Sequence, residues 1–152
     1  MRIRPSRPDD RDFVLGLVPE LLAFGSPPPW RDAERMRTVD RRVLEDVLDG
    51  RAPGATVLVA EDEGGERLGF VHLTEWADFY GSKSGHVGDV VVAPDARGRG
   101  VGTALLAEAE DWARERGHRI LTLNVFARNE SARRVYERAG FVPEVVRYAK
   151  PI

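Results

Sequence analysis

Hydrophobic and polar positions change their spacing several times along the chain, and each change predicts an element. An alternating run at 1–5 predicts a strand, and apolar residues at helical spacing follow over 7–24, where Pro19 predicts a kink. A second helical pattern over 31–48 precedes two strand patterns within 55–76, which an acidic Gly-Gly turn joins as a hairpin. The elements predicted next are a strand over 86–94, a helix over 100–116, a strand over 118–127, a helix over 129–140 and a strand over 141–150.

This order of elements predicts a single α/β domain over 1–152, with one sheet covered by helices. The strands on either side of the helix at 100–116 can be parallel neighbours, because a helix separates them. The apolar runs are only a few residues long, far below the roughly 20 that span a bilayer. The chain also begins with polar residues in place of a signal-peptide core, so we expect a cytoplasmic protein.

Composition excludes several classes of function. The chain has no cysteine, which rules out disulfides, thiolate metal sites and a cysteine nucleophile. Its formal net charge is −2, from 25 acidic and 23 basic residues, and this balance gives no global reason to expect a nucleic-acid partner. His72, His86 and His118 lack the spacing of metal ligands, so we interpret them as ordinary strand or loop residues and expect no metal.

A glycine-rich segment, RGRGVGTALL at 97–106, opens the helix predicted over 100–116. Positions 97–101 hold no Ser, Thr, Asp or Asn that could cap the free amides of a helix start. Those amides lack partners within the helix, and the helix dipole adds partial positive charge, so a bound phosphate could serve as the cap. A plain glycine-rich turn in an arginine-rich chain is the alternative.

Three phosphate-binding patterns compete for this segment. The nucleotide P-loop requires a lysine, whereas the chain offers Gly102-Thr103 without one. The dinucleotide-binding fingerprint requires a glycine at position 103. The third pattern, Arg/Gln-x-x-Gly-x-Gly/Ala, is satisfied by Arg97, Gly100 and Gly102, and with it the sequence resembles the GNAT superfamily of acyl-CoA-dependent N-acyltransferases.

A second segment, LNVFARNESARRVYERAGF at 123–141, resembles the other core motif of that superfamily. The resemblance implies acetyl-CoA as the cofactor and a mixed, mostly antiparallel sheet, splayed at a bulge between central strands and flanked by about four helices. Gly88, inside a strand pattern, independently indicates a bulge. The cofactor-binding residues that the resemblance implies are Val90, Val91, Val92, Arg97, Gly98, Arg99, Gly100, Val101, Gly102, Thr103, Asn129, Arg133 and Tyr136.

Three of these residues share one face of the helix predicted over 129–140. Asn129, Arg133 and Tyr136 are four and then three residues apart, so they can line one ligand. Asn129 also suits the N-cap of this helix, and both roles can hold together. For Tyr136, a core aromatic packed under the helix is the alternative.

The resemblance further implies an N-acetyltransferase that acts on a primary amine of a small molecule or peptide by direct attack. Tyr136 matches the tyrosine that protonates the leaving thiolate in the family. Asp89 matches an acidic position beside the thioester, although strand alternation puts it on the face opposite Val90 unless a bulge at Gly88 re-aims it. The residues expected to bind the acceptor are Trp30, Glu75, Trp76, Phe79 and Tyr80.

The identity of the general base stays open at this point. Some family members carry a glutamate where this chain has Gly88, and others carry one where Asn124 stands. A chain of water molecules ending at Glu75, Asp89 or His86 is the alternative to a direct base.

Two other functions compete with the acetyltransferase. One is a non-catalytic acyl-CoA-binding or sensing module, and the other is a nucleic-acid-binding domain that uses the RGRG run, which the net charge disfavours. We therefore expect an amine acceptor as the partner, with neither nucleic acid nor a membrane. The resemblance also implies that a valine-rich final strand, predicted here over 141–150, can support a homodimer.

Overall fold

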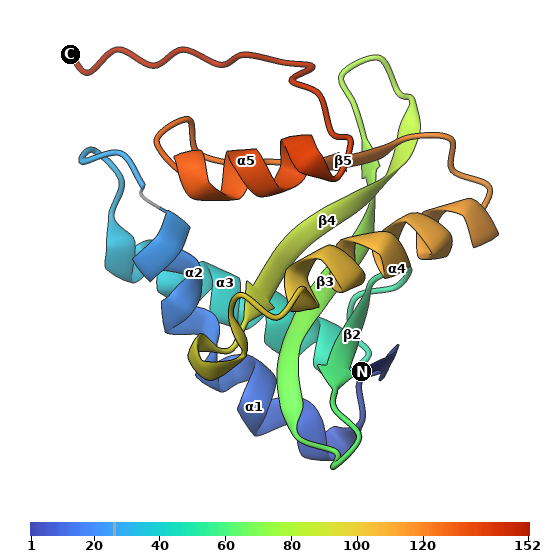
Figure 1. The fold of residues 1–152 in the computed structure, drawn as a ribbon. Helices are drawn as coiled ribbons and strands as arrows, with labels where there is room; N and C mark the ends of the chain where they lie inside the picture. Colours follow the sequence, from blue (N-terminus) through green and yellow to red (C-terminus); the bar gives the residue numbers. More distant parts are fainter. Residues whose placement is uncertain (26) are drawn as a thin grey trace.

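One five-stranded sheet in the order β1-β2-β3-β4-β5 organises the computed structural model, which describes residues 1–25 and 27–152 (Figure 1). Neighbouring strands from β1 to β4 are antiparallel, and β5 is parallel to β4, so the expected mixed and mostly antiparallel sheet is confirmed. The strands are β1 (Arg2–Pro5), β2 (Thr56–Glu61), β3 (Arg67–Ala77), β4 (Lys83–Val92) and β5 (Leu121–Leu123).

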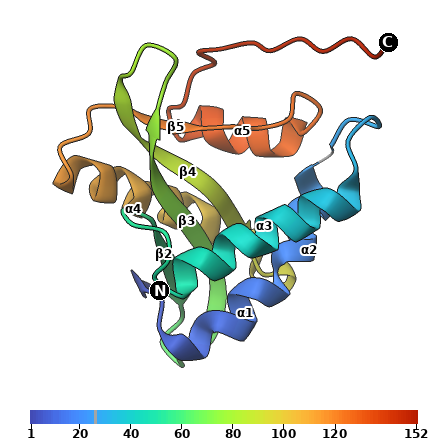
Figure 2. The same cartoon turned by 180° about the vertical axis from the view of Figure 1, so that it is seen from behind.

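Helices cover both faces of this sheet, with α1, α2 and α3 on one side and α4 on the other (Figures 1 and 2). The pattern predicted over 7–24 forms two helices. The helical conformation is interrupted at Leu17, and Pro19 occupies the second position of the next helix. The predicted kink is thereby confirmed. The helices are α1 (Arg11–Gly16), α2 (Val18–Gly25), α3 (Ala33–Leu48), α4 (Val101–Glu115) and α5 (Glu130–Arg138).

The core lies between the sheet and these two helical layers. Phe70 and Leu73 of β3, Leu44 of α3 and Leu105 of α4 are fully buried. Trp112 lies on the inner face of α4 and is 5% exposed, in agreement with its predicted place in the core.

Near the C-terminus, one predicted strand is shorter than expected and another is wrong. The strand expected over 118–127 is limited to β5, and the segment at 141–150 forms no strand but extends away from the body of the molecule (Figure 1). The apolar residues of that segment do not alternate, because Val145 and Val146 are adjacent, and Pro143 has no amide to donate to a ladder. No single face of such a strand could be buried, and its valines are exposed.

A β-bulge in β4 interrupts the sheet at its centre. His72 pairs with Asp89 while the next residue of β3 pairs with Val87, so Gly88 is the extra residue. The parallel pairing of β4 with β5 covers only positions 85–87 of β4 and ends just before the bulge. The bulge predicted at Gly88 and the splay of the two strands beyond it are both confirmed.

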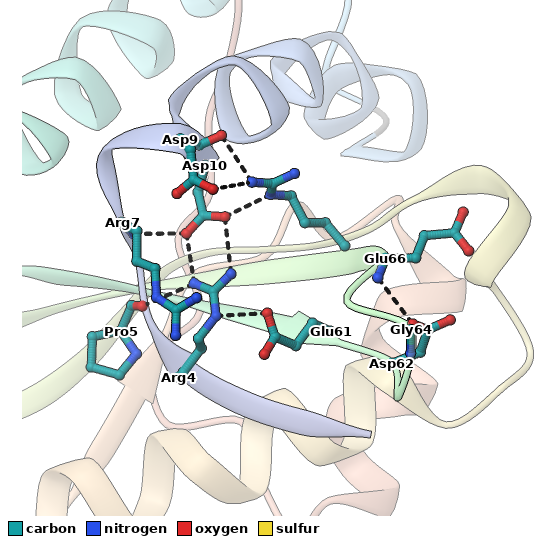
Figure 3. A network of polar contacts seen from close by, with 10 residues as sticks. Arg4, Pro5, Arg7, Asp9, Asp10, Glu61, Asp62, Gly64 and Glu66 are labelled. Atoms are coloured by element: carbon teal, nitrogen blue, oxygen red, sulfur yellow. Dashed lines mark hydrogen bonds and ion pairs between the residues drawn. The ribbon is translucent and has the colours of Figure 1, made fainter.

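A buried charge network connects β1 to the start of the first helical segment and to β3 (Figure 3). Asp10 is 0% exposed and accepts hydrogen bonds from the Arg4 guanidinium at 2.6 and 3.1 Å, from Arg67 Nε at 2.6 Å and from the Arg7 backbone amide at 2.7 Å. Arg4 also donates to Glu61 at 2.7 Å. Burial alone would raise the pKa of Asp10, but the three arginine donors outweigh it and hold that pKa well below its usual range.

Replacing Asp10 with Asn should lower the free energy of unfolding by about 3–5 kcal/mol, because Arg4 would keep its buried charge and lose a partner. The folded-state pKa of Asp10 lies below its unfolded value, so its contribution is present above the unfolded value and disappears as the pH falls from about 5. Urea unfolding at several pH values measures both effects. Asp9→Asn is the matched control, since Asp9 is 70% exposed in its pair with Arg67 and its loss should cost below about 1 kcal/mol. Equal losses from the two substitutions would contradict this account.

Candidate active site

A cavity of about 510 Å³ lies beside β4 where that strand and β5 separate. The elements that border it are α2, α3, the second half of β4, the chain that follows β5, and α5. Its polar and charged lining residues are Glu20, Asp40, Asp89, Arg97, Asn124, Asn129, Ser131 and Tyr136.

The bulge determines which side of the sheet the β4 side chains face. A Cβ on Gly85 would touch α4, and Val92 packs against the first turn of α4. These two positions are separated by seven residues, so in a regular strand they would face opposite sides. The extra residue at Gly88 turns both toward α4, and it directs Asp89 to the other side, where α3 lies.

Asp89 lines the cavity and influences the pKa of two other lining residues. One carboxylate oxygen, Oδ2, lies 3.0 Å from His72 Nδ1, and the side chain is 17% exposed. Burial and the nearby charge of Asp89 raise the pKa of Asp40, on α3, to about 6. Burial and the same charge raise the pKa of Tyr136, on α5, above its ordinary value. The cavity therefore brings together a carboxylate, a second carboxyl that titrates near pH 6, and a phenol that keeps its proton at neutral pH.

The glycine-rich segment forms the expected uncapped helix start. Gly98 and Gly100 adopt φ of 74° and 78°, a left-handed conformation that side chains other than glycine rarely tolerate. Helix α4 begins at Val101, and no side chain caps its first amides. Amides without a side-chain cap, at the positive end of a 15-residue helix, suit a phosphate group.

Arg97 connects this segment to the cavity. Its guanidinium donates to Glu20 of α2 at 2.7 Å, and both side chains line the cavity. Through this ion pair, the arginine of the Arg-x-x-Gly-x-Gly pattern connects the glycine-rich segment to α2.

The other predicted cofactor residues do not all line the cavity. Val90, Val91 and Val92 line the cavity, and so does Asn129, which also caps α5 by accepting the Ala132 amide at 3.2 Å. The two roles foreseen for Asn129 are therefore compatible. Arg133, Gly98, Gly100, Gly102 and Thr103 do not line it, and Arg99 and Val101 border a separate cavity of about 340 Å³ near Asp62 and Gly64.

The predicted acceptor residues lie outside the cavity. Phe79 and Tyr80 are 97% and 88% exposed at the tip of the β3–β4 hairpin, and they pack edge to face on each other. Trp76 packs against His86, and Glu75 accepts a hydrogen bond from His118, both near the same end of the sheet. Trp30 is exposed just before α3. The direction of the hairpin tip depends on strand twist and bulges, which residue spacing does not reveal.

Two residues that sequence reasoning passed over lie at this site. Asp40 lies in the helical pattern predicted over 31–48, where its position four residues after Met36 and four before Leu44 puts it on the buried stripe of α3. An acid on an apolar stripe is a signal for function or pairing. The sequence alone indicates an ordinary strand or loop residue at His72. The register of β3 with β4 reveals that it faces Asp89.

Neither a membrane span nor a metal cluster is found in the part of the chain that the structure describes. No helix there is long and apolar enough to cross a bilayer. No three or more His, Asp and Glu side chains converge there in a way that could hold a metal ion.

Comparison with known proteins places this geometry in a family. A profile described as Acetyltransferase (GNAT) family matches residues 20–141. A mycothiol acetyltransferase of Propionibacterium freudenreichii is 45% identical over 141 residues, covering 93% of this chain and 43% of that protein. The uncharacterized N-acetyltransferase YhfO of Bacillus subtilis is 36% identical over 144 residues, covering 93% of this chain and 89% of that protein. A solved structure of a putative acetyl transferase from Pyrococcus furiosus has a TM-score of 0.77 at 27% identity, and 99% of each chain is covered.

Proposed function

Since this chain belongs to the acetyltransferase (GNAT) family, we propose that it transfers an acetyl group from acetyl-CoA to a primary amine of a small molecule or peptide. The observation that carries this proposal is the cavity beside the β4 bulge, where Asp89 and Tyr136 supply a base and an acid. A general base or a general acid that is positioned at the reacting group accelerates the reaction by about 10²–10⁴-fold.

The residues present fit acetyl-CoA along one side of β4. Pairing with β5 stops at Val87, so the backbone of Val90 and Val92 is left open to an extended arm that pairs as an added strand. The amides of positions 98–103 at the start of α4 suit the pyrophosphate, and Arg97, through its ion pair with Glu20, connects this segment to the cavity. When bound, acetyl-CoA supplies an activated acyl thioester.

The charges of the cavity favour a cationic acceptor. Glu20, Asp40 and Asp89 line it, and Arg97 is the one arginine among the lining residues that the structure describes; its guanidinium is paired with Glu20. An ammonium is attracted there, and Asp89 can take its proton so that the nitrogen gains a lone pair. Tyr136 then donates a proton to the leaving sulfur, and the second proton of the amine restores the phenol.

A thiol-release assay tests the proposed function. The protein is incubated with acetyl-CoA and a panel of small amines and amino-terminal peptides, and free coenzyme A is followed with a thiol reagent. We expect release that depends on both the protein and an amine. Binding of acetyl-CoA with no release above the amine-free rate for any amine would favour the non-catalytic sensing module.

Replacing Asp40 with Asn should raise the KM for a cationic amine about tenfold and leave the KM for acetyl-CoA unchanged, because one of the anionic groups facing the acceptor is lost. The pKa of Asp40 is about 6, so wild-type affinity for the amine should weaken as the pH falls below 6, and the variant should lack that step. Initial rates between pH 5 and 8 measure both effects. Asp46→Asn, on the exposed side of the same helix, is the control. A step near pH 6 that persists in the Asp40 variant would contradict the assignment.

A further inference from the structure

His72 lies beside Asp89 on β3, the strand that flanks β4 on the side opposite β5. It is 4% exposed, it pairs with Asp89 across the β3–β4 ladder, and it does not line the cavity. Its Nδ1 is 3.0 Å from Asp89 Oδ2. An ionised carboxylate can only accept a hydrogen bond, so Nδ1 carries the hydrogen and donates it. The imidazole therefore contacts the carboxylate and not the acceptor.

Gly88 makes the room that this imidazole occupies. A Cβ at position 88 would stand 2.4 Å from His72 Nδ1 and 2.8 Å from its Cε1, distances that no real contact allows. The residue that forms the bulge and turns Asp89 toward α3 is thus also the residue that lets the ring reach Asp89. The bulge, the glycine and the histidine form one local arrangement.

We propose that His72 is a positioning residue that fixes the Asp89 carboxylate for proton abstraction, a role that rests on the proposed acetyltransferase function. The hydrogen bond to Oδ2 selects one rotamer and leaves Oδ1 for the acceptor ammonium. The other titratable groups near Asp89 are Asp40 on α3, His86 on β4 and Tyr136 on α5.

His72→Leu removes the donor and should lower kcat/KM for the amine about 10–100-fold, the usual effect of losing a group that orients a reacting one. The KM for acetyl-CoA should not change. His72→Asn should keep activity within a few-fold, because its amide N–H occupies nearly the place of Nδ1. His72→Gln is the matched control, since its amide reaches the place of Nε2 instead and should behave like the Leu variant.

The pH profile separates positioning from simple packing. In the Leu and Gln variants the acidic limb of kcat/KM should move to higher pH, because the carboxylate loses a hydrogen bond that favours its charged form. In an Asp89→Asn background, His72→Leu should cost less than twofold, because the group it positions is gone. If Leu destabilises the fold, the Asn and Gln pair carries the comparison.

Three results would overturn the positioning role: equal activity of the Asn and Gln variants, an acidic limb that does not move, or a full His72→Leu loss on top of Asp89→Asn. If the wild type releases thiol and the His72 variants have the same activity, the positioning role is refuted and the proposed function stands. A wild-type protein that binds acetyl-CoA but releases no thiol with any amine refutes the proposed function, and the positioning role falls with it.

Discussion

Replacing Tyr136 with Phe should lower kcat about 10²–10³-fold and leave the affinity for acetyl-CoA within about twofold. The ring that packs edge to face on Phe141, with centroids 6.1 Å apart, is retained, so the variant loses only the hydroxyl. Burial and Asp89 raise the pKa of that hydroxyl above its ordinary value, so the wild type holds the proton to be donated across the neutral range. Steady-state rates together with calorimetric titration of acetyl-CoA measure the two quantities separately.

Tyr148→Phe is the matched control, because Tyr148 is 91% exposed in the C-terminal segment and is not part of the cavity lining. Its turnover should equal that of the wild type. The acid role also predicts a difference between acyl donors. With a donor whose thiol has a low pKa, Tyr136→Phe should lower kcat less, because that thiolate leaves without protonation. An unchanged kcat in Tyr136→Phe would remove Tyr136 from the chemistry and leave it as a wall of the cavity.

The parts of the site that the sequence could predict are those governed by local chemistry. A missing N-cap and glycines at 98 and 100 define the start of α4, and these features depend only on backbone conformation within a few residues. Gly88 likewise indicated a bulge because glycine inside a strand is costly without a reason. Each of these signals is contained in a short segment.

The parts that the sequence could not predict depend on contacts between distant segments. The pairing of His72 with Asp89 follows from the register of two strands, and a shift of one residue would have turned His72 to the other face. The approach of Asp40 to Asp89 depends on how α3 lies across the sheet. The aromatic residues of the β3–β4 hairpin tip are exposed and lie outside the cavity. Twist and bulges set the direction of a hairpin tip, and the spacing of residues in the sequence does not encode either one.

Replacing Asp89 with Asn should lower kcat/KM for the amine about 10²–10⁴-fold at pH 7, because the substitution keeps the shape of the side chain and removes the base. The His72 N–H can still donate to the amide oxygen, so the strand register and the bulge should persist. If Asp89 acts by removing a proton, the deficit should shrink about tenfold per pH unit as the pH rises toward the pKa of the amine, because the neutral amine then arrives without help. Initial rates across that range measure the slope.

A second consequence of Asp89→Asn does not require activity. The charge of Asp89 is one of the two causes that raise the pKa of Asp40 to about 6, and burial is the first. The variant should therefore lower that pKa toward, but not fully to, its ordinary value, which carboxyl-carbon NMR can follow against pH. Glu75→Gln is the control, because Glu75 pairs with His118 outside the cavity. A constant deficit at all pH values, with the Asp40 pKa lowered as expected, would make Asp89 an electrostatic or structural group and return the role of base to a water molecule.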